Sequence, residues 1–129
     1  YDIAPVKLNP VTGKPLPILI GGHSDAAFRR AARFDGFMFA GGGPDDLAGP
    51  IAAINAARVE AGTADRPFRI FATAMGDFSV DTIRRLEDLG VTDMPVAFRN
   101  LYAVEEDRQP LADKIDAMKH FADTVIARG

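Results

Sequence analysis

Hydrophobic residues along the chain gather in four short runs, and each run is followed by a longer stretch in which they recur every three or four positions. The runs are largely uninterrupted by polar residues. Such runs are typical of strands that a parallel sheet buries on both faces. We therefore expect four parallel strands, at residues 17–20, 37–40, 68–74 and 94–98.

The stretches between the runs carry helical periodicity and the residues that commonly begin and end helices. Ser79 is placed to cap one helix, and Gly90 to end it. Gly62 is placed to end the preceding helix, and Pro110 takes the first position of the last one. The expected helices run from about residue 25 to 34, from 47 to 61, from 80 to 89 and from 110 to 125.

Four strands that alternate with four helices give a (βα)4 order in an α/β domain. That order fits an open flavodoxin-like sheet, and it also fits half of an eight-stranded barrel, whose full length is about 250 residues. The hydrophobic pattern does not choose between them. Residues 1–16 are rich in proline and contain a Thr12-Gly13 turn signal, so we expect an extended connector ahead of a domain at residues 17–129.

The composition narrows the classes of function. The chain has 129 residues, 47% of them hydrophobic, and a formal net charge of -3, and no Lys/Arg cluster marks a nucleic-acid surface. It has no cysteine, which excludes disulfides and Cys-based metal sites and fits a cytoplasmic location. No apolar run approaches the roughly 18 residues of a membrane span, and no signal-peptide pattern is present. Because the chain starts at Tyr1 rather than at a methionine, we interpret it as a fragment.

The residues between the first run and the first helix, Gly21-Gly22-His23-Ser24, have the layout of a phosphate-binding loop. The two glycines let the backbone bend and a ligand approach closely, and Ser24 can cap the helix while its free N–H groups face an anion. His23 could donate a hydrogen bond to that anion, or it could face solvent. The same residues also fit a sharp strand-to-helix turn, so the spacing alone leaves both interpretations open.

A second candidate for anion binding is Arg99, which directly follows the fourth run. Barrel enzymes often place an anion anchor there, and a guanidinium suits phosphate or carboxylate. The alternative is an ion pair with one of the acidic residues at 105–107. His120 lies in the middle of the last helix and is expected at the surface. Two histidines that are distant in the sequence do not form a recognisable ligand set, so we predict no metal site.

The glycines at 41–43 could form a further anion cradle, because successive free N–H groups beside a helix start attract anions. Asp45 and Asp46 follow at the helix N-terminus. Their carboxylates would satisfy the helix dipole themselves and repel phosphate, which favours a flexible loop or lid.

Several segments of the chain resemble the luciferase-like monooxygenase family. Pro17-Ile-Leu-Ile-Gly-Gly-His-Ser24, followed by Ala31-Ala-Arg-Phe-Asp-Gly-Phe37, is similar to that family's IGG-H-S turn and AAR-x-(G)DGW strand. The likeness continues through residues 79–91 and 96–100, so it covers nearly the whole chain. Two departures are Phe37, where many members carry tryptophan, and an Ala-Arg-Phe-Asp-Gly segment that is one residue shorter than usual.

The resemblance implies a fold, a cofactor and a binding site. The four βα units would be strands five to eight of a (β/α)8 TIM barrel, with parallel strands. Members of the family are flavin- or deazaflavin-dependent oxidoreductases, which implies flavin mononucleotide (FMN) or the deazaflavin coenzyme F-420 as cofactor, and a small-molecule substrate. Gly21, Gly22, His23 and Ser24 would hold the cofactor phosphate. In such a barrel the loops after the strands share one rim, which places residues 21–24, 41–45, 74–77 and 99–102 together.

No acid–base pair or nucleophilic triad can be assembled from these residues, because Ser24 and Ser79 are both explained as helix caps. We therefore predict no catalytic side chain, and we expect the cofactor to supply the chemistry and the chain alone to be inactive. An alternative of a different class is a non-catalytic half-barrel that binds a phosphorylated ligand or self-associates. Its open strand edges would invite pairing with another chain, so we expect a homo-oligomer.

Overall fold

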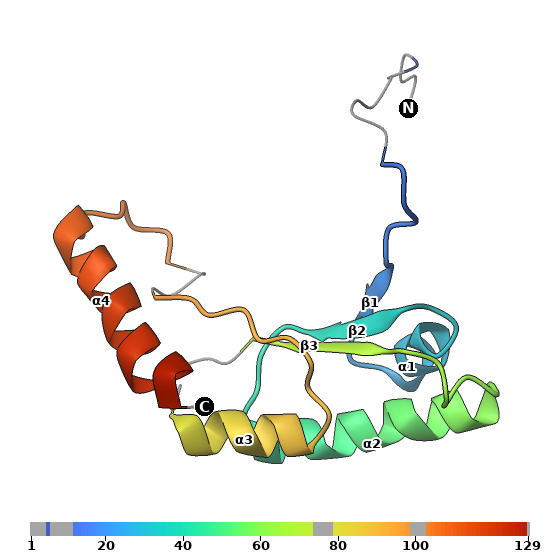
Figure 1. Ribbon diagram of the computed structural model, residues 1–129. Coiled ribbons are helices and arrows are strands. Elements are labelled where there is room, and N and C mark those ends of the chain that lie inside the picture. Colours follow the sequence, from blue (N-terminus) through green and yellow to red (C-terminus); the bar gives the residue numbers. More distant parts are fainter. Residues whose placement is uncertain (1–4, 6–11, 74–78, 99–102, 129) are drawn as a thin grey trace.

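The computed structural model describes residues 5, 12–73, 79–98 and 103–128 and shows a mixed α/β fold with three parallel strands and four α-helices (Figure 1). The predicted alternation of strand and helix is confirmed for the first three units. The elements in chain order are β1 (Leu19–Gly21), α1 (Asp25–Ala31), β2 (Gly36–Phe39), α2 (Pro44–Glu60), β3 (Arg69–Ala72), α3 (Val80–Asp88), α4 (Leu111–Thr124) and a short 3-10 turn η1 (Ile126–Arg128).

The sheet has the sequential order β1-β2-β3, with β2 in the middle and both pairings parallel. Gly36 opens β2 opposite Leu19 on one side and Arg69 on the other. A Cβ atom at Gly36 would lie 2.3 Å from the carbonyl oxygen of Arg69. The glycine is therefore needed there, because any side chain would push β2 and β3 apart.

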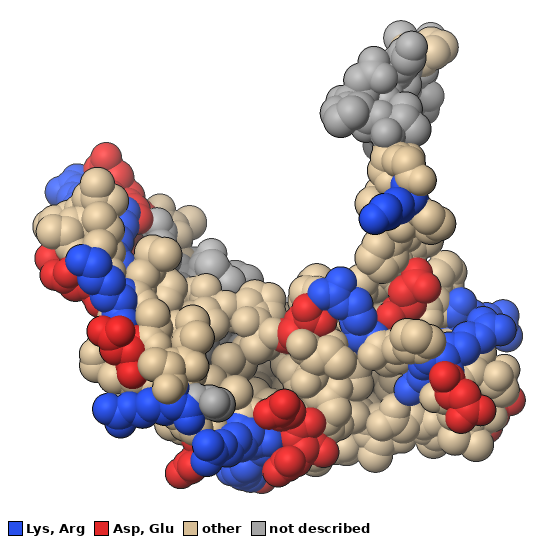
Figure 2. Space-filling model, viewed as in Figure 1, with Lys and Arg blue, Asp and Glu red and all other residues tan. Residues whose placement is uncertain are grey.

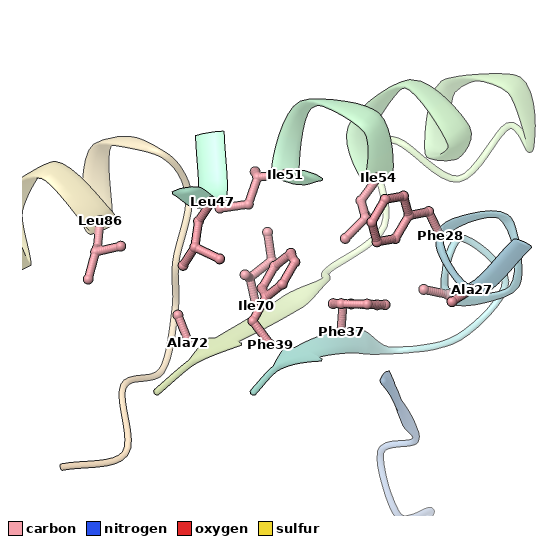
Figure 3. Packing of buried hydrophobic residues seen from close by; sticks show 11 residues of the cluster. Ala27, Phe28, Phe37, Phe39, Leu47, Ile51, Ile54, Ile70, Ala72 and Leu86 are labelled. Atoms are coloured by element: carbon pink, nitrogen blue, oxygen red, sulfur yellow. The ribbon is translucent and has the colours of Figure 1, made fainter. Parts of the chain in front are cut away.

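One face of the sheet carries the hydrophobic core. Phe37 on β2 is 0% exposed, and its ring lies 5.4 Å from that of Phe28 on α1 and 4.7 Å from that of Phe39. Figure 3 shows these rings and Ile70 of β3 directed toward side chains from three helices. The helical contributions come from Ala27 and Phe28 of α1, Leu47, Ile51 and Ile54 of α2, and Leu86 of α3. All three helices thus cover the same face.

The opposite face of the sheet is open. Met38 is 47% exposed between two buried neighbours of β2 and is paired in register with Gly21 and Phe71. Figure 1 shows no helix over this side of β2 and β3 within the described part of the chain. The strands are therefore apolar on both faces but covered on one.

The predicted helix boundaries are largely confirmed. The Ser79 hydroxyl accepts a hydrogen bond from the Thr82 N–H (3.3 Å), and Gly62 and Gly90 follow the ends of α2 and α3 with φ of 66° and 95°. Pro110 precedes α4 directly. The first helix is shorter than expected, because the chain turns after Ala31.

The predicted fourth strand at residues 94–98 is wrong, since the structure has no strand there. A single parallel bridge joins Phe71 to Asp93, where the Ala72 N–H donates to the Asp93 carbonyl (3.0 Å). Two residues later Pro95 lacks the N–H that would extend the ladder. The chain therefore pairs with β3 at Asp93 and does not continue as a strand.

Helix α4 was expected to complete a fourth βα unit, but it stands apart from the sheet in Figure 1, with its end near the start of α3. No residue of α4 is buried, and Leu111, Ile115 and Met118 of its predicted apolar face are 72%, 40% and 58% exposed. The Phe121 ring meets that of Phe98 edge-on at 5.9 Å. Without a strand beside β3, α4 has no sheet surface to cover.

Candidate functional site

The candidate phosphate loop is the short connection between β1 and α1. β1 ends at Gly21 and α1 begins at Asp25, so three residues, Gly22 to Ser24, make the turn. Gly21, His23 and Ser24 are exposed, and Gly22 is half-buried. The structure thus brings the four predicted residues together at the carboxyl end of β1, where parallel α/β folds place their ligands.

Gly22 is the residue that the backbone requires to be glycine. Its φ is +140°, and a Cβ atom there would lie 2.8 Å from the Cβ of Ala27. Gly21 is different, because a Cβ atom would meet its nearest neighbour, the Met38 carbonyl oxygen, at 3.7 Å. Gly22 therefore makes the sharp turn possible, whereas Gly21 keeps the surface beside the turn free of a side chain.

Ser24 acts as the N-cap of α1, as predicted. Its backbone is extended (φ -117°, ψ 155°), and its hydroxyl accepts a hydrogen bond from the Ala27 N–H at 3.3 Å. The N–H groups of Asp25 and Ala26 lie at the start of the helix, where helical N–H groups have no partner within the helix. An anion beside the loop could accept from them, although the exposed carboxylate of Asp25 adds negative charge at the same point.

His23 is exposed at the middle of the turn. Its imidazole is therefore accessible to a ligand and to solvent alike. The remaining predicted site residue, Arg99, lies outside the described residues, as do the predicted rim loops at 74–77 and 99–102.

The glycine loop after β2 is tied to its own helix. The Gly43 N–H donates to Asp46 Oδ2 at 3.0 Å, which satisfies the start of α2 with a carboxylate. Asp45 accepts instead from Arg85 of α3 at 2.6 Å. Asp46 thus already occupies one N–H group that an anion cradle would offer, and the prediction of a flexible loop or lid stays a prediction.

The surface charges are mixed. Figure 2 shows Lys and Arg side chains interspersed with Asp and Glu on the visible face. Among the described residues, no group of three or more His, Cys, Asp or Glu side chains is placed to hold a metal ion. Within the same residues, no helix is both long enough and apolar enough to cross a membrane.

A hollow between α3, α4 and Phe98 was not predicted from the sequence. It has a volume of about 500 Å³, and Phe98, His120 and Phe121 are among its lining residues. The one available signal was Phe121, an aromatic residue beside the helical stripe that runs through Met118 and Ala122. His120 was expected at the surface; it is exposed there and also lines this hollow.

Comparison with known proteins gives relatives but no family. No family model matches the chain, and no solved structure matches it. The chain is 48% identical over 128 residues to the uncharacterized proteins Mb0965c of Mycobacterium bovis and Rv0940c of Mycobacterium tuberculosis. The match covers 99% of this chain and 44% of each relative, so the chain spans less than half the length of the curated proteins that it resembles.

Proposed function

We propose that this chain is the C-terminal half of a flavin- or deazaflavin-dependent oxidoreductase of the luciferase-like monooxygenase type, and that it supplies the side of the active site that binds the cofactor phosphate. The observation that carries the proposal is the connection between β1 and α1. There a glycine at φ +140° and a serine cap place exposed backbone and His23 at the carboxyl end of a parallel strand. The proposal rests on this whole loop, and on the likeness of its residues to the family motif, rather than on the end of the short helix α1.

The strand order supports a half-barrel over a flavodoxin-like sheet. Crossovers between parallel strands are right-handed, so strands added in one direction put their helices on one face. The order here is sequential, and α1, α2 and α3 share one face. A doubly wound sheet reverses its order at one point and carries helices on both faces. The bridge at Asp93 continues the same direction past β3.

The lengths of the relatives fit the same proposal. More than half of each relative lies outside the matched region. Four further βα units would occupy about half of a complete barrel. Those units would also cover the open face of the sheet and give α4 a place in the ring of helices.

In this proposal the chain binds and orients, and the cofactor supplies the redox chemistry when bound. Gly21 leaves room for the phosphate, and Gly22 turns the backbone so that the following N–H groups point outward. Ser24 fixes the start of α1, and His23 donates a hydrogen bond to a phosphate oxygen. Arg99 stays a predicted second anchor, and a cytoplasmic location stays a prediction as well.

The test is a comparison of FMN with riboflavin, which has the same ring system and no phosphate. Flavin fluorescence is followed as the chain is added, and F-420 is titrated in parallel. A phosphate loop predicts that FMN binds at least about tenfold more tightly than riboflavin, because charge-assisted hydrogen bonds contribute about 1.5–3 kcal/mol each. The substitutions Gly21→Val and His23→Ala should each reduce that difference.

Two matched controls separate binding from folding. Gly13→Val introduces the same side chain into the connector, where nothing lies within 4 Å of the new Cβ, and should leave FMN binding unchanged. Ser79→Ala removes the cap of α3 and is compared with Ser24→Ala, which removes the cap of α1. Equal binding of FMN and riboflavin in every variant would reject the phosphate loop. Failure of both FMN and F-420 to bind would reject this chain as the phosphate-binding side.

One observation favours a second candidate, a non-catalytic half-barrel that self-associates. The open face of the sheet exposes Met38 beside Phe71, although parallel sheets are normally covered on both faces. A second copy could cover it. Sedimentation equilibrium tests this second candidate, which predicts a dimer that Met38→Asp converts to a monomer. The oxidoreductase candidate instead predicts flavin binding, whether or not the chain associates.

A further inference from the structure

The hollow between α3 and α4 is formed by apolar side chains from three separate segments. Phe98 belongs to the chain segment that follows α3, Val80 lies in the first turn of α3, and Phe121 and Val125 lie in the last turn of α4 and at its C-cap. The Phe98 and Phe121 rings meet edge-on at 5.9 Å, and Phe98 remains 42% exposed. Aromatic surface is therefore still available in the hollow after the two rings have packed together.

A second, smaller hollow of about 280 Å³ adjoins the larger one. It shares Val80, Phe121 and Val125 with the larger one and continues past Met94 and Ile126. The end of α4 and the start of α3 thus line both hollows.

The position and size of the larger hollow favour a small molecule as its occupant. Its lining includes Ser79 and Val80 at the start of α3. Figure 1 shows the start of α3 on the side of the sheet where β2 and β3 end. Ligands of α/β folds bind outside the carboxyl ends of the strands. Its volume of about 500 Å³ also falls within the range of about 300–1,000 Å³ that is typical of small-molecule sites.

The polar groups of the hollow are few. The Ser79 hydroxyl accepts the hydrogen bond that caps α3, and the Thr124 hydroxyl donates to the His120 carbonyl oxygen at 2.7 Å. His120, which is exposed, supplies the remaining polar side chain of the lining. An imidazole can donate or accept a hydrogen bond at neutral pH.

We infer that this hollow binds a small, uncharged aromatic molecule that carries one hydroxyl or carbonyl group, with the carbon skeleton against Phe98 and Phe121 and the polar group at His120. This inference concerns a site separate from the phosphate loop and does not depend on flavin binding. If the longer protein is the oxidoreductase proposed above, the same hollow is a place for its organic substrate.

The test uses 1-naphthol as the probe and 1-methylnaphthalene as its partner without a hydroxyl group. Binding to the full 129-residue chain is followed by NMR, through the methyl signals of Val80 and Val125 and the ring signals of Phe121. We expect both probes to shift these signals in a saturable way, with 1-naphthol binding several-fold more tightly. The methyl signals of Val59, which is 68% exposed at the far end of α2, should stay in place.

Three variants locate the probe. Ala117→Trp fills the hollow from α4 and should weaken both probes at least about tenfold, because the indole ring would occupy the space that the probe needs. Ala112→Trp places the same ring on the exposed part of α4, away from the lining residues, and should have no effect. His120→Leu should remove the preference for 1-naphthol and leave the affinity for 1-methylnaphthalene within about twofold.

The inference is overturned if saturating probe leaves the signals of Val80, Val125 and Phe121 in place, or if Ala117→Trp and Ala112→Trp bind alike. It is also overturned if the shifts follow protein concentration instead of probe concentration, because the hollow would then be filled by a second copy. None of these readouts involves flavin. Failure here and failure of the phosphate loop can therefore be told apart.

Discussion

The two faces of the sheet have similar sequences and different surroundings. On the face toward the helices, Phe37 and Ile70 are 0% and 4% exposed, and three helices pack against them. On the other face, Met38 is 47% exposed, and Phe71 is half-buried beside the guanidinium of Arg69, which lies 4.8 Å from its ring. Both faces carry large apolar side chains, but within the described residues only one is covered by helices.

This difference indicates whether the open face is suited to water or to contact with further polypeptide. In a strand with one face toward water, polar residues on that face alternate with apolar residues on the buried face, as in antiparallel sheets. Met38 and Phe71 do not follow that pattern. The open face is therefore suited to packing against further polypeptide, which a closed barrel or a second copy would provide.

The largest effect is expected when neighbouring residues of β2, one on each face of the sheet, are replaced by alanine. Phe37→Ala removes a fully buried ring and should lower the free energy of unfolding by about 3–5 kcal/mol. Met38→Ala, one position along, should cost less than about 1 kcal/mol, because the side chain is already half in water. Urea unfolding followed by circular dichroism measures both. Similar losses would mean that Met38 is buried in solution, and the unfolding midpoint would then rise with protein concentration.

A second test separates close backbone packing from side-chain packing. Gly36→Ala puts a methyl group 2.3 Å from the Arg69 carbonyl oxygen and should cost about 1–3 kcal/mol by forcing β2 and β3 apart. Gly13→Ala, in the connector, has nothing within 4 Å of the new Cβ and should change the free energy of unfolding by less than about 0.5 kcal/mol. The same unfolding assay gives both values. A neutral Gly36→Ala variant would show that the two strands are not held at this distance.

The first three βα units could be predicted from the sequence because each local signal agrees with the others. The run at 37–40, the cap at Ser79 and the glycines at 62 and 90 are each decided within a few residues, and the structure follows them. The candidate loop was predictable for the same reason. Its turn depends on Gly22 and Ser24 alone.

The fourth unit could not be predicted in this way because its structure depends on distant partners. Residues 94–98 have the composition of a strand, but Pro95 interrupts the ladder and the described residues offer no strand on the far side. Helix α4 has an apolar stripe, as predicted, yet a stripe does not specify which surface covers it. The hollow beside α4 could not be predicted from the sequence, because Phe98 and Phe121 come into contact only in the folded chain.

A smaller effect is expected at the edge of the open face, where Arg69 and Asp93 form an ion pair. The hydrogen bond from Arg69, and a second one from Thr92, hold the pKa of Asp93 below its ordinary value. A carboxyl with a lowered folded pKa contributes stability above its unfolded pKa of about 3.9, and that stability is lost as the pH falls through the folded pKa. The free energy of unfolding should therefore fall more steeply below about pH 4 in the native chain than in Asp93→Asn.

Salt provides the control for that pH dependence. Arg69 and Asp93 keep side-chain exposures of 47% and 25%, so ions should screen the pair. The difference between the native chain and Asp93→Asn at neutral pH should shrink as sodium chloride is raised. A difference that persists in high salt would instead assign the role of the Asp93 side chain to the hydrogen bond that it accepts from the Thr92 hydroxyl.

The smallest effect is expected in α4, whose apolar side chains are exposed like those of the open face. Ile115 of α4 is 40% exposed, and Ile54 of α2 is 0% exposed, so the same substitution can be made at both. Ile54→Ala should cost about 2–5 kcal/mol. Ile115→Ala should change the free energy of unfolding by less than about 0.5 kcal/mol, because the small loss of contact is offset by the higher helix propensity of alanine. A loss of more than about 1 kcal/mol at Ile115 would mean that α4 packs against a surface in solution. Dilution would then identify that surface, since stability that falls with concentration places the partner in another copy, and stability independent of concentration places it in the same chain.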